Sequence, residues 1–350
     1  LPTVGEKKFR EEERKSWFSH KAEVSKPHYY SVYLADYDVT AEMTPSNRGC
    51  LMRFTFPQTD RANVVIDAFD RGSQIGMLDN RTIVGYTTRN SGGVPENFRN
   101  YFVVRFDTPF TAVELTGAPG EYEPGSSLFY PDGEKSVTGG HAVAKVHFAT
   151  RRGQQVCASV ASSFISPEQA LRNLQEVGER GFDEVCAAAK QRWNDVLGRI
   201  EIREGNLDHL RTFYTCLYRS TLFPRKFYEF DAQGKPWHYS PYNGEVLPGY
   251  MYTDTGFWDT FRSLFPLLNL VYPEMGARMQ EGLVNAYLES GFLPEWASPG
   301  HRGCMVGNNS ASVVADAWVK GLRGYDVEKL WEAVLHGANS VHPQVSSTGR

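Results

Sequence analysis

The sequence lacks the features that would suit it to a membrane or to nucleic acid. Its 350 residues hold no apolar run of about 18 or more, so they predict no membrane-spanning helix, and no signal peptide is visible. The formal net charge is −4, which leaves no electrostatic case for binding nucleic-acid phosphates. Hydrophobic residues make up 41% and charged residues 22%, a balance that is typical of a globular protein.

Cysteine is scarce and forms no recognisable pattern. The five cysteines show no CxxC pair and no histidine spacing typical of zinc, so the sequence identifies no metal site. Their odd number argues against a complete disulfide framework, and we predict mostly buried free thiols. The cysteines are Cys50, Cys157, Cys186, Cys216 and Cys304.

Short internal repeats are also lacking, which argues against a solenoid. The sequence begins at Leu1 without an initiator methionine and stops at Arg350, directly after a helical pattern. We therefore expect both ends to be cut and a further part of the same gene product to follow. Aromatic residues are plentiful at 13%, which suits sugar binding and suits a large β-sandwich core equally well.

Residues 1–165 predict a β-sandwich domain that lacks its amino-terminal end. Short segments rich in β-branched and aromatic residues alternate with turn clusters such as the one at 90–95. Many short strands at this spacing favour an antiparallel sandwich. The expected strands include residues 29–34, 39–43, 51–56, 63–67, 101–106, 141–148 and 155–161.

The pattern changes to helix near residue 166. Ser166 is a good N-cap and Pro167 fits the first helical position, so we expect a helical linker over residues 166–205. Residues 206–350 predict mainly helix, and successive antiparallel helices favour a toroid or a bundle. The expected helices there include 255–270, 273–290, 308–322 and 327–338.

The densest chemical signal lies near the start of the helix expected at 255–270. Trp258, Asp259, Thr260 and Arg262 place an aromatic ring, a carboxylate, a hydroxyl and a guanidinium within about one turn, which suits a polyhydroxylated ligand. A purely structural interpretation stays open. Asp259 would then favour the helix start, Arg262 would pair with it, and Trp258 would lie in the core.

A second dense segment follows at residues 291–321. Pro294 ends the preceding pattern, so Glu295 and Trp296 are expected on a loop, where Trp296 either binds ligand or covers the core. The glycine-punctuated loop that follows offers Arg302, Cys304 and Asn308. Cys304 lacks a recognisable basic partner, and Asn308 would also serve as a helix cap.

Three stretches of the sequence strongly resemble glycoside hydrolase family 92, the calcium-dependent exo-acting α-mannosidases. They read GFWDTFRSLFPLLNLVYPE at 256–274, LPEW at 293–296 and GCMVGNNSASVVADAWVKG at 303–321. Residues 18–34, 51–57 and 101–106 are similar to the family as well. The resemblance implies a β-sandwich, a helical linker and the first helices of an (α/α)₆ toroid.

The same resemblance implies the release of terminal mannose from glycans with inversion at the anomeric carbon. Among the possible linkages, α-1,2 is the one that we expect ahead of the others. It implies bound calcium and a periplasmic, cell-surface or secreted location. Trp258, Asp259 and Arg262 match the WDTFR motif of the family's mannose pocket. The other expected pocket residues are Glu295, Trp296, Arg302, Cys304 and Asn308.

The catalytic part of the family pattern does not occur in this sequence. Family segments resembling EGNAWQY and NDDCGQMSAW carry the acid and the base, and a segment resembling GNEP-HH carries calcium ligands. None of them is found here, so we expect them beyond Arg350 and expect residues 1–350 alone to be inactive. A non-catalytic carbohydrate-binding protein is the alternative hypothesis.

Overall fold

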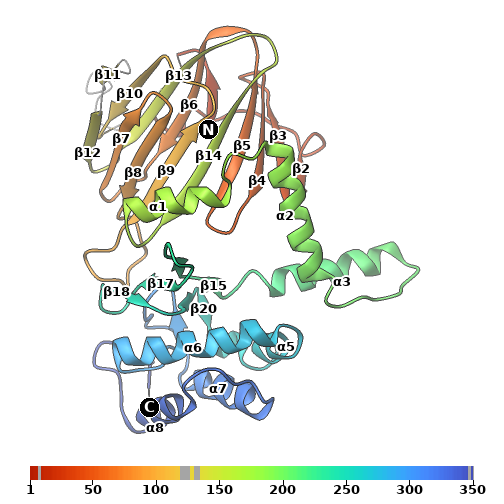
Figure 1. Ribbon diagram of the computed structural model, residues 1–350, viewed down its shortest axis with the longest axis vertical. Helices are drawn as coiled ribbons and strands as arrows, with labels where there is room; N and C mark the ends of the chain where they lie inside the picture. Colours follow the sequence, from red (N-terminus) through yellow and green to blue (C-terminus); the bar gives the residue numbers. More distant parts are fainter. Residues whose placement is uncertain (7–8, 119–126, 130–134, 346–347, 350) are drawn as a thin grey trace. The chain divides into compact units, whose positions relative to one another are not determined.

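The computed structural model describes residues 1–6, 9–118, 127–129, 135–345 and 348–349. It divides into two compact units (Figure 1). Unit 1 comprises Leu1–Arg89 and Arg99–Asp195, and unit 2 comprises Asn90–Phe98 and Val196–Arg350. Among the residues that the structure describes, none of the helices has the length and apolar character needed to span a membrane.

Two antiparallel sheets form unit 1 (Figure 1). In spatial order, the described strands of the larger sheet are β12 (Lys135–Gly139), β7 (Ser73–Asp79), β8 (Thr82–Thr87), β9 (Asn100–Phe106), β14 (Gln154–Ser163), β5 (Gly49–Phe56), β4 (Val39–Pro45), β3 (Tyr29–Leu34) and β2 (Val24–Lys26). Those of the smaller sheet are β1 (Pro2–Val4), β6 (Thr59–Asp67), β13 (Val143–Thr150), β10 (Ala112–Thr116) and β11 (Ser127–Phe129).

The core of unit 1 lies between the two sheets. Side chains from both sheets alternate into one buried cluster, for example Ile75 and Phe106 from the larger sheet and Val146 and Phe148 from the smaller. The Phe106 and Phe148 rings meet edge to face with their centroids 5.2 Å apart. The predicted antiparallel sandwich is therefore confirmed.

All seven expected strands are present, and residues 29–34 match β3 at both ends. Strands β1, β2, β7, β8, β10, β11 and β12 were not among the strands expected from the sequence. Gly76 lies within β7 and Gly85 lies within β8. A glycine weakens the pattern of β-branched residues by which a strand is predicted from sequence.

Two helices cover the outer face of the larger sheet (Figure 1). Helix α1 (Pro167–Asn173) begins at Ser166, whose hydroxyl accepts the Gln169 N–H, which confirms the expected cap. A 3₁₀ turn (Leu174–Glu176) and helix α2 (Phe182–Leu197) follow. The division between the units falls within α2, so most of the region expected as a linker belongs to the β-rich unit.

Unit 2 is mainly helical. Its longer helices are α3 (Leu207–Ser220), α5 (Leu264–Val271), α6 (Pro273–Ser290), α7 (Asn309–Val319) and α8 (Val327–Asn339). Helix α6 has the expected bounds, because Pro273 occupies its first turn and Gly291 adopts a left-handed φ of 82° after its end. Phe265, Leu283, Val313 and Leu330 contribute to the buried core of this unit.

The prediction of one helix over 255–270 was wrong. The chain instead forms the four-residue helix α4 (Phe257–Thr260), turns, and starts again as α5 at Leu264. Pro266 explains the break, because a continuous helix would place it in the interior, without an N–H and in collision with the carbonyl of Arg262. The restart puts Pro266 in a first turn, where proline is tolerated.

Short strands occupy residues 225–256, where mainly helix was expected. Pro236, Pro241 and Pro248 recur too closely for a helix to form. The described strands are β15 (Arg225–Lys226), β16 (Glu229–Phe230), β17 (Pro236–Tyr239), β18 (Val246–Pro248), β19 (Tyr252–Thr253) and β20 (Thr255–Gly256).

The five cysteines are free thiols, as expected, but the prediction that they are mostly buried was wrong. Cys50, Cys157 and Cys186 are half-buried, while Cys216 on α3 and Cys304 on a loop are exposed. Burial raises the pKa of Cys50 to about 11 and that of Cys157 to about 12. Both of these thiols therefore remain protonated and unreactive at neutral pH.

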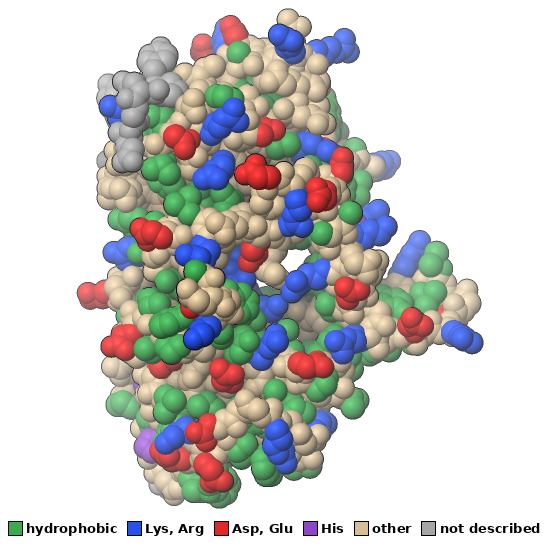
Figure 2. All heavy atoms as spheres, in the orientation of Figure 1, with side chains coloured by type: hydrophobic (Ala, Val, Ile, Leu, Met, Phe, Trp, Pro, Cys, Tyr) green, Lys and Arg blue, Asp and Glu red, His purple; other side chains and the backbone are tan. Residues whose placement is uncertain are grey.

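Several large apolar side chains of unit 2 are exposed. Val319 is 82% exposed, and Leu270, Leu288 and Trp331 are also largely uncovered. Figure 2 shows hydrophobic side chains on the visible face of this unit. Such surfaces commonly mark contacts with further protein.

Phe106→Ala is expected to destabilise unit 1 by about 3–5 kcal/mol, because it leaves a cavity in the sandwich core. Phe106 is 1% exposed, whereas Phe18 of the same unit is 41% exposed. Chemical denaturation of the complete protein would measure the change, with Phe18→Ala as the matched control. Equal losses for the two variants would contradict this view of the core.

Candidate functional site

A short β-ladder brings the two dense sequence segments together. Strand β20 pairs antiparallel with β21 (Trp296–Ala297), and Gly256 lies opposite Trp296. The Phe257 N–H donates to the Glu295 carbonyl at 2.9 Å, which continues the contact into the start of α4. Trp258 and Asp259 on α4 are thus held beside the Glu295–Trp296 segment.

Asp259 presents an exposed carboxylate next to this ladder. No hydrogen bond or ion pair from another described residue reaches it. A methyl group on Gly256 would lie 2.7 Å from Asp259 Oδ2 and 3.5 Å from Trp296 Nε1. Gly256 therefore leaves the space in which the Asp259 carboxylate and the indole edge of Trp296 approach each other.

Arg262 lies in the turn after α4 and packs on aromatic rings. Its guanidinium is 5.0 Å from the Trp258 ring centroid and 4.5 Å from that of Phe261, and it donates to the Trp258 carbonyl at 3.1 Å. The alternative pairing with Asp259 is not formed. Trp258 is 39% exposed, so the structural interpretation that placed its ring in the core was wrong.

Glu295 is not exposed to a ligand. The residue is 1% exposed, and both oxygens of its carboxylate accept hydrogen bonds from the start of α7. Oε2 accepts the Asn309 N–H at 2.8 Å, and Oε1 accepts the Ser310 N–H at 3.2 Å and the Ser310 hydroxyl at 2.6 Å. Burial raises the pKa of Glu295, and these hydrogen bonds oppose that effect.

Arg302 holds a loop that sequence reasoning missed. Its guanidinium donates to the Ser298 carbonyl at 2.8 Å, to the Ser91 carbonyl at 2.7 Å and to the Ser91 hydroxyl. The segment Asn90–Phe98 belongs to unit 2, whereas the sequence indicated only a turn cluster at residues 90–95. Gly93 is a sign of this close approach, because a methyl group on Gly93 would lie only 2.7 Å from the His301 carbonyl oxygen.

The loop from Gly303 to Asn308 is exposed and contains Cys304. Met305 and Asn308 adopt left-handed φ angles of 69° and 64°. Asn308 occupies the N-cap position of α7, but its side chain makes no capping bond and instead approaches the Gly337 carbonyl at 3.5 Å. Since α7 packs against α4, this loop ends beside the Asp259 segment.

His301 is enclosed between two other rings. Its ring centroid lies 4.7 Å from that of Tyr242 and 4.8 Å from that of His342, and its Nε2 is 2.9 Å from the Ser290 hydroxyl. Within the described residues its Nδ1 is buried without a hydrogen-bond partner. Burial and, to a smaller extent, the neighbouring His342 lower the pKa of His301 to about 3.

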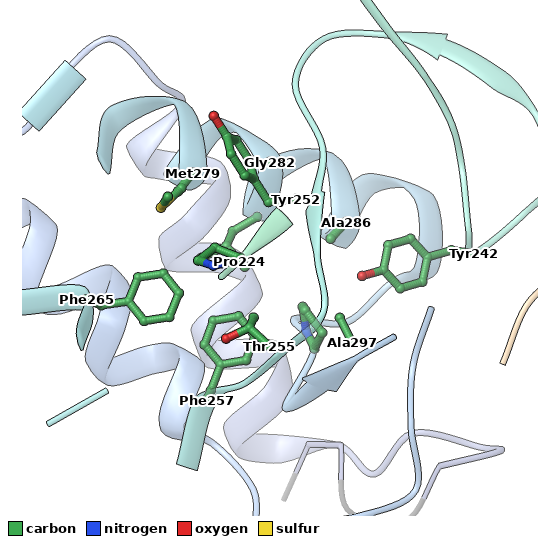
Figure 3. Close-up of a pocket in the computed structure, with 12 residues that line it drawn as sticks. Pro224, Tyr242, Tyr252, Thr255, Phe257, Phe265, Met279, Gly282, Ala286 and Ala297 are labelled. Atoms are coloured by element: carbon green, nitrogen blue, oxygen red, sulfur yellow. The ribbon is translucent and has the colours of Figure 1, made fainter. Parts of the chain in front are cut away.

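A small cavity lies behind the strand that leads to α4 (Figure 3). Its volume of ≈ 20 Å³ suits about one water molecule and is too small for a sugar ring. Thr255, Phe257, Met279 and Ala297 are among its mainly apolar lining residues. The cavity is therefore no binding site for a sugar, and the exposed face that carries Trp258, Asp259 and Trp296 is the better candidate.

In the described part of the chain, no group of three or more His, Cys, Asp or Glu side chains is arranged to hold a metal ion. Calcium requires about six to eight oxygen ligands. Asp259 alone offers an unengaged carboxylate next to the β20–β21 ladder, so the residues present do not fit a calcium site.

Comparison with known families gives matches over nearly the whole chain. Residues 1–163 match the glycosyl hydrolase family 92 N-terminal domain, and residues 169–350 match the glycosyl hydrolase family 92 catalytic domain. No curated protein matches the chain.

Solved structures of this family are similar in fold as well. The family GH92 inverting mannosidase BT2199 from Bacteroides thetaiotaomicron VPI-5482 is 43% identical with a TM-score of 0.93, over 100% of this chain and 46% of that chain. The GH92 α-mannosidase BT3965 from Bacteroides thetaiotaomicron is 31% identical with a TM-score of 0.82, over 95% of this chain and 46% of that chain. A structure of BT3965 contains mannoimidazole.

A third structure, the GH92 glycosyl hydrolase ccman5, is 23% identical with a TM-score of 0.72, over 91% of this chain and 44% of that chain, and shows the fold alone. This chain thus spans less than half the length of each of these structures. The likenesses confirm the expected order of a β-sandwich followed by a helical region.

Stability is expected to fall as the pH drops from about 6.5 toward 3, in part because of His301. Since the folded pKa of His301 is depressed to about 3, the unfolded chain binds a proton in this window that the folded chain does not. His301→Phe keeps the ring and removes the titration, so the free energy of unfolding should depend less steeply on pH, by roughly 1 kcal/mol per pH unit. Urea unfolding of the complete protein at pH 7, 6 and 5 would measure it.

The matched control is His209→Phe, since the His209 side chain is 68% exposed on α3. The slope should change more in His301→Phe than in this control. If the two variants change it equally, the enclosed histidine is not a particular source of acid sensitivity.

Proposed function

Since this chain belongs to glycoside hydrolase family 92, we propose that the complete protein is an inverting, exo-acting α-mannosidase. This chain would supply the β-sandwich and the part of the helical domain that holds the terminal mannose. The observation that carries the proposal is the exposed Asp259 carboxylate, which no other described residue bonds, beside the strand that carries Trp296.

Each of these side chains has a chemical role in holding a sugar. The exposed ring of Trp258 and the half-buried ring of Trp296 suit the CH groups of a pyranose ring. The Asp259 carboxylate can accept hydrogen bonds from two hydroxyl groups, and these bonds are strong because the acceptor is charged. Arg262 holds the Trp258 ring by a cation–π contact and keeps further N–H donors available to the ligand.

Hydrolysis with inversion needs a second set of residues. One carboxylic acid protonates the leaving oxygen and one carboxylate activates water, with the two carboxyl groups about 6.5–9.5 Å apart. We assign neither role to a residue of this chain and propose that both lie in another part of the complete protein. Calcium, where the family uses it, would be held there too, since the described residues do not fit it.

Terminal α-1,2-linked mannose is the first substrate to test, and mannose-containing glycans are the proposed partners. We propose a periplasmic, cell-surface or secreted location, in line with the export expected for the family. The alternative is a carbohydrate-binding protein without catalysis, and turnover of a mannobioside by the complete protein separates the two.

Asp259→Ala in the complete protein should raise KM for an α-mannobioside about tenfold or more, because a charged hydrogen-bond acceptor for the sugar is lost. The exposed carboxylate has no structural partner, so the unfolding midpoint should stay unchanged. Steady-state kinetics and thermal unfolding measure the two effects. The matched control is Asp208→Ala on α3, which removes another exposed carboxylate of unit 2. Wild-type KM in Asp259→Ala would remove this residue from the pocket.

Gly256→Ala offers an independent test of the geometry. The added methyl group would lie 2.7 Å from Asp259 Oδ2 and must displace that carboxylate, while the φ of −101° is accessible to alanine. We expect a rise in KM in the same direction as for Asp259→Ala. The double variant should be little worse than Asp259→Ala alone, since both changes act through one carboxylate. Additive losses would show that Gly256 acts by another route.

A further inference from the structure

Glu295 connects two elements of the candidate site through different atoms. Its carbonyl oxygen accepts the Phe257 N–H at 2.9 Å, at the start of the helix that carries Trp258 and Asp259. Its carboxylate accepts the N–H groups of Asn309 and Ser310 and the Ser310 hydroxyl, at the start of α7. One residue thus joins α4 to α7.

The start of α7 depends on this carboxylate. The first N–H groups of a helix have no partner within the helix, and Asn308 at the N-cap position makes no side-chain capping bond. Glu295 therefore takes the place of the missing cap from outside the helix. Its negative charge at a helix N-terminus is also favourable.

Burial makes these hydrogen bonds difficult to replace. Glu295 is 1% exposed, so water cannot readily take over if the carboxylate is lost, and the freed N–H groups would remain unsatisfied. A buried carboxylate with both oxygens engaged is also unsuited to contact a sugar directly. Its influence on the pocket has to pass through the elements that it joins.

We propose that Glu295 is a positioning residue that fixes the loop Gly303–Asn308 and the start of α7 against α4, and thereby sets the geometry of the mannose pocket. This inference rests on the proposed function and goes beyond it, because it replaces the expected contact of Glu295 with sugar by an indirect role. Asp259 binds the ligand, and Glu295 holds the surroundings of Asp259 in place.

Length and charge of the side chain should both matter. Glu295→Gln keeps the length but replaces one acceptor oxygen by an NH₂ group that would face an N–H donor. Glu295→Asp keeps the charge but shortens the reach by one methylene group. Ser310→Ala removes only the hydroxyl partner at 2.6 Å and should have a smaller effect in the same direction.

The test measures KM and kcat of the complete protein on an α-mannobioside for wild type, Glu295→Gln and Ser310→Ala. The matched control is Asp326→Ala, since Asp326 caps α8 by accepting the Lys329 N–H at 2.9 Å and forms no hydrogen bond with the described residues of α4 or of the loop. Both Glu295→Gln and the control lose a helix cap, and their unfolding midpoints should fall. Only Glu295→Gln should raise KM, roughly tenfold or more.

A general loss of stability would give a different pattern. If Asp326→Ala raises KM as much as Glu295→Gln does, or if folded Glu295→Gln keeps the wild-type KM, the positioning role is wrong. Hydrogen exchange gives a readout without catalysis: Glu295→Gln should speed amide exchange over 303–311 and over 257–261, and Asp326→Ala should not. A wild-type protein without turnover would contradict the proposed function, and unchanged exchange would contradict the positioning role.

Discussion

The candidate site depends on one constraint: the buried carboxylate of Glu295 accepts the hydrogen bonds donated by the start of α7. Glu295 satisfies helix N–H groups that Asn308 leaves without a side-chain cap, while its main chain holds the start of α4. Removing a charge from water is costly unless hydrogen bonds replace the lost hydration. The hydrogen bonds that Asn309 and Ser310 donate to the Glu295 carboxylate supply that replacement, so the positions of α4 and α7 are tied to each other.

A second constraint acts along the chain at Pro266. Because proline cannot continue the helix from α4, the chain turns at residues 261–263 and leaves α4 as a single short turn. Trp258 and Asp259 lie on this short helix and are exposed. The break that the sequence pattern did not predict therefore falls directly after the candidate ligand-binding residues.

The ends of helices could be predicted from nearby residues in the sequence, whereas hydrogen-bond partners that lie far apart in the sequence could not. Helix α6 was predicted at both ends, because Pro273 and Gly291 act within their own turns. The role of Glu295 could not be predicted, since its partners are backbone N–H groups of residues 309 and 310, and backbone groups leave no mark in a sequence. The family resemblance predicted pocket residues on both dense segments but did not distinguish exposed Asp259 from buried Glu295.

The hydrogen bonds and ion pairs of the carboxylates near the β20–β21 ladder show which of them is free to contact a ligand. Three carboxylates lie within three residues, along the chain, of strand β20 or strand β21: those of Asp254, Asp259 and Glu295. Asp254 pairs with Arg225 at 3.1 Å and accepts the Ser298 hydroxyl at 2.8 Å, and Glu295 is committed to α7. Only Asp259 is left to meet a ligand, and one carboxylate cannot act as both the acid and the base of an inverting reaction. Under the proposed function, these two segments would hold the sugar, and its cleavage would draw on carboxyl groups from outside them.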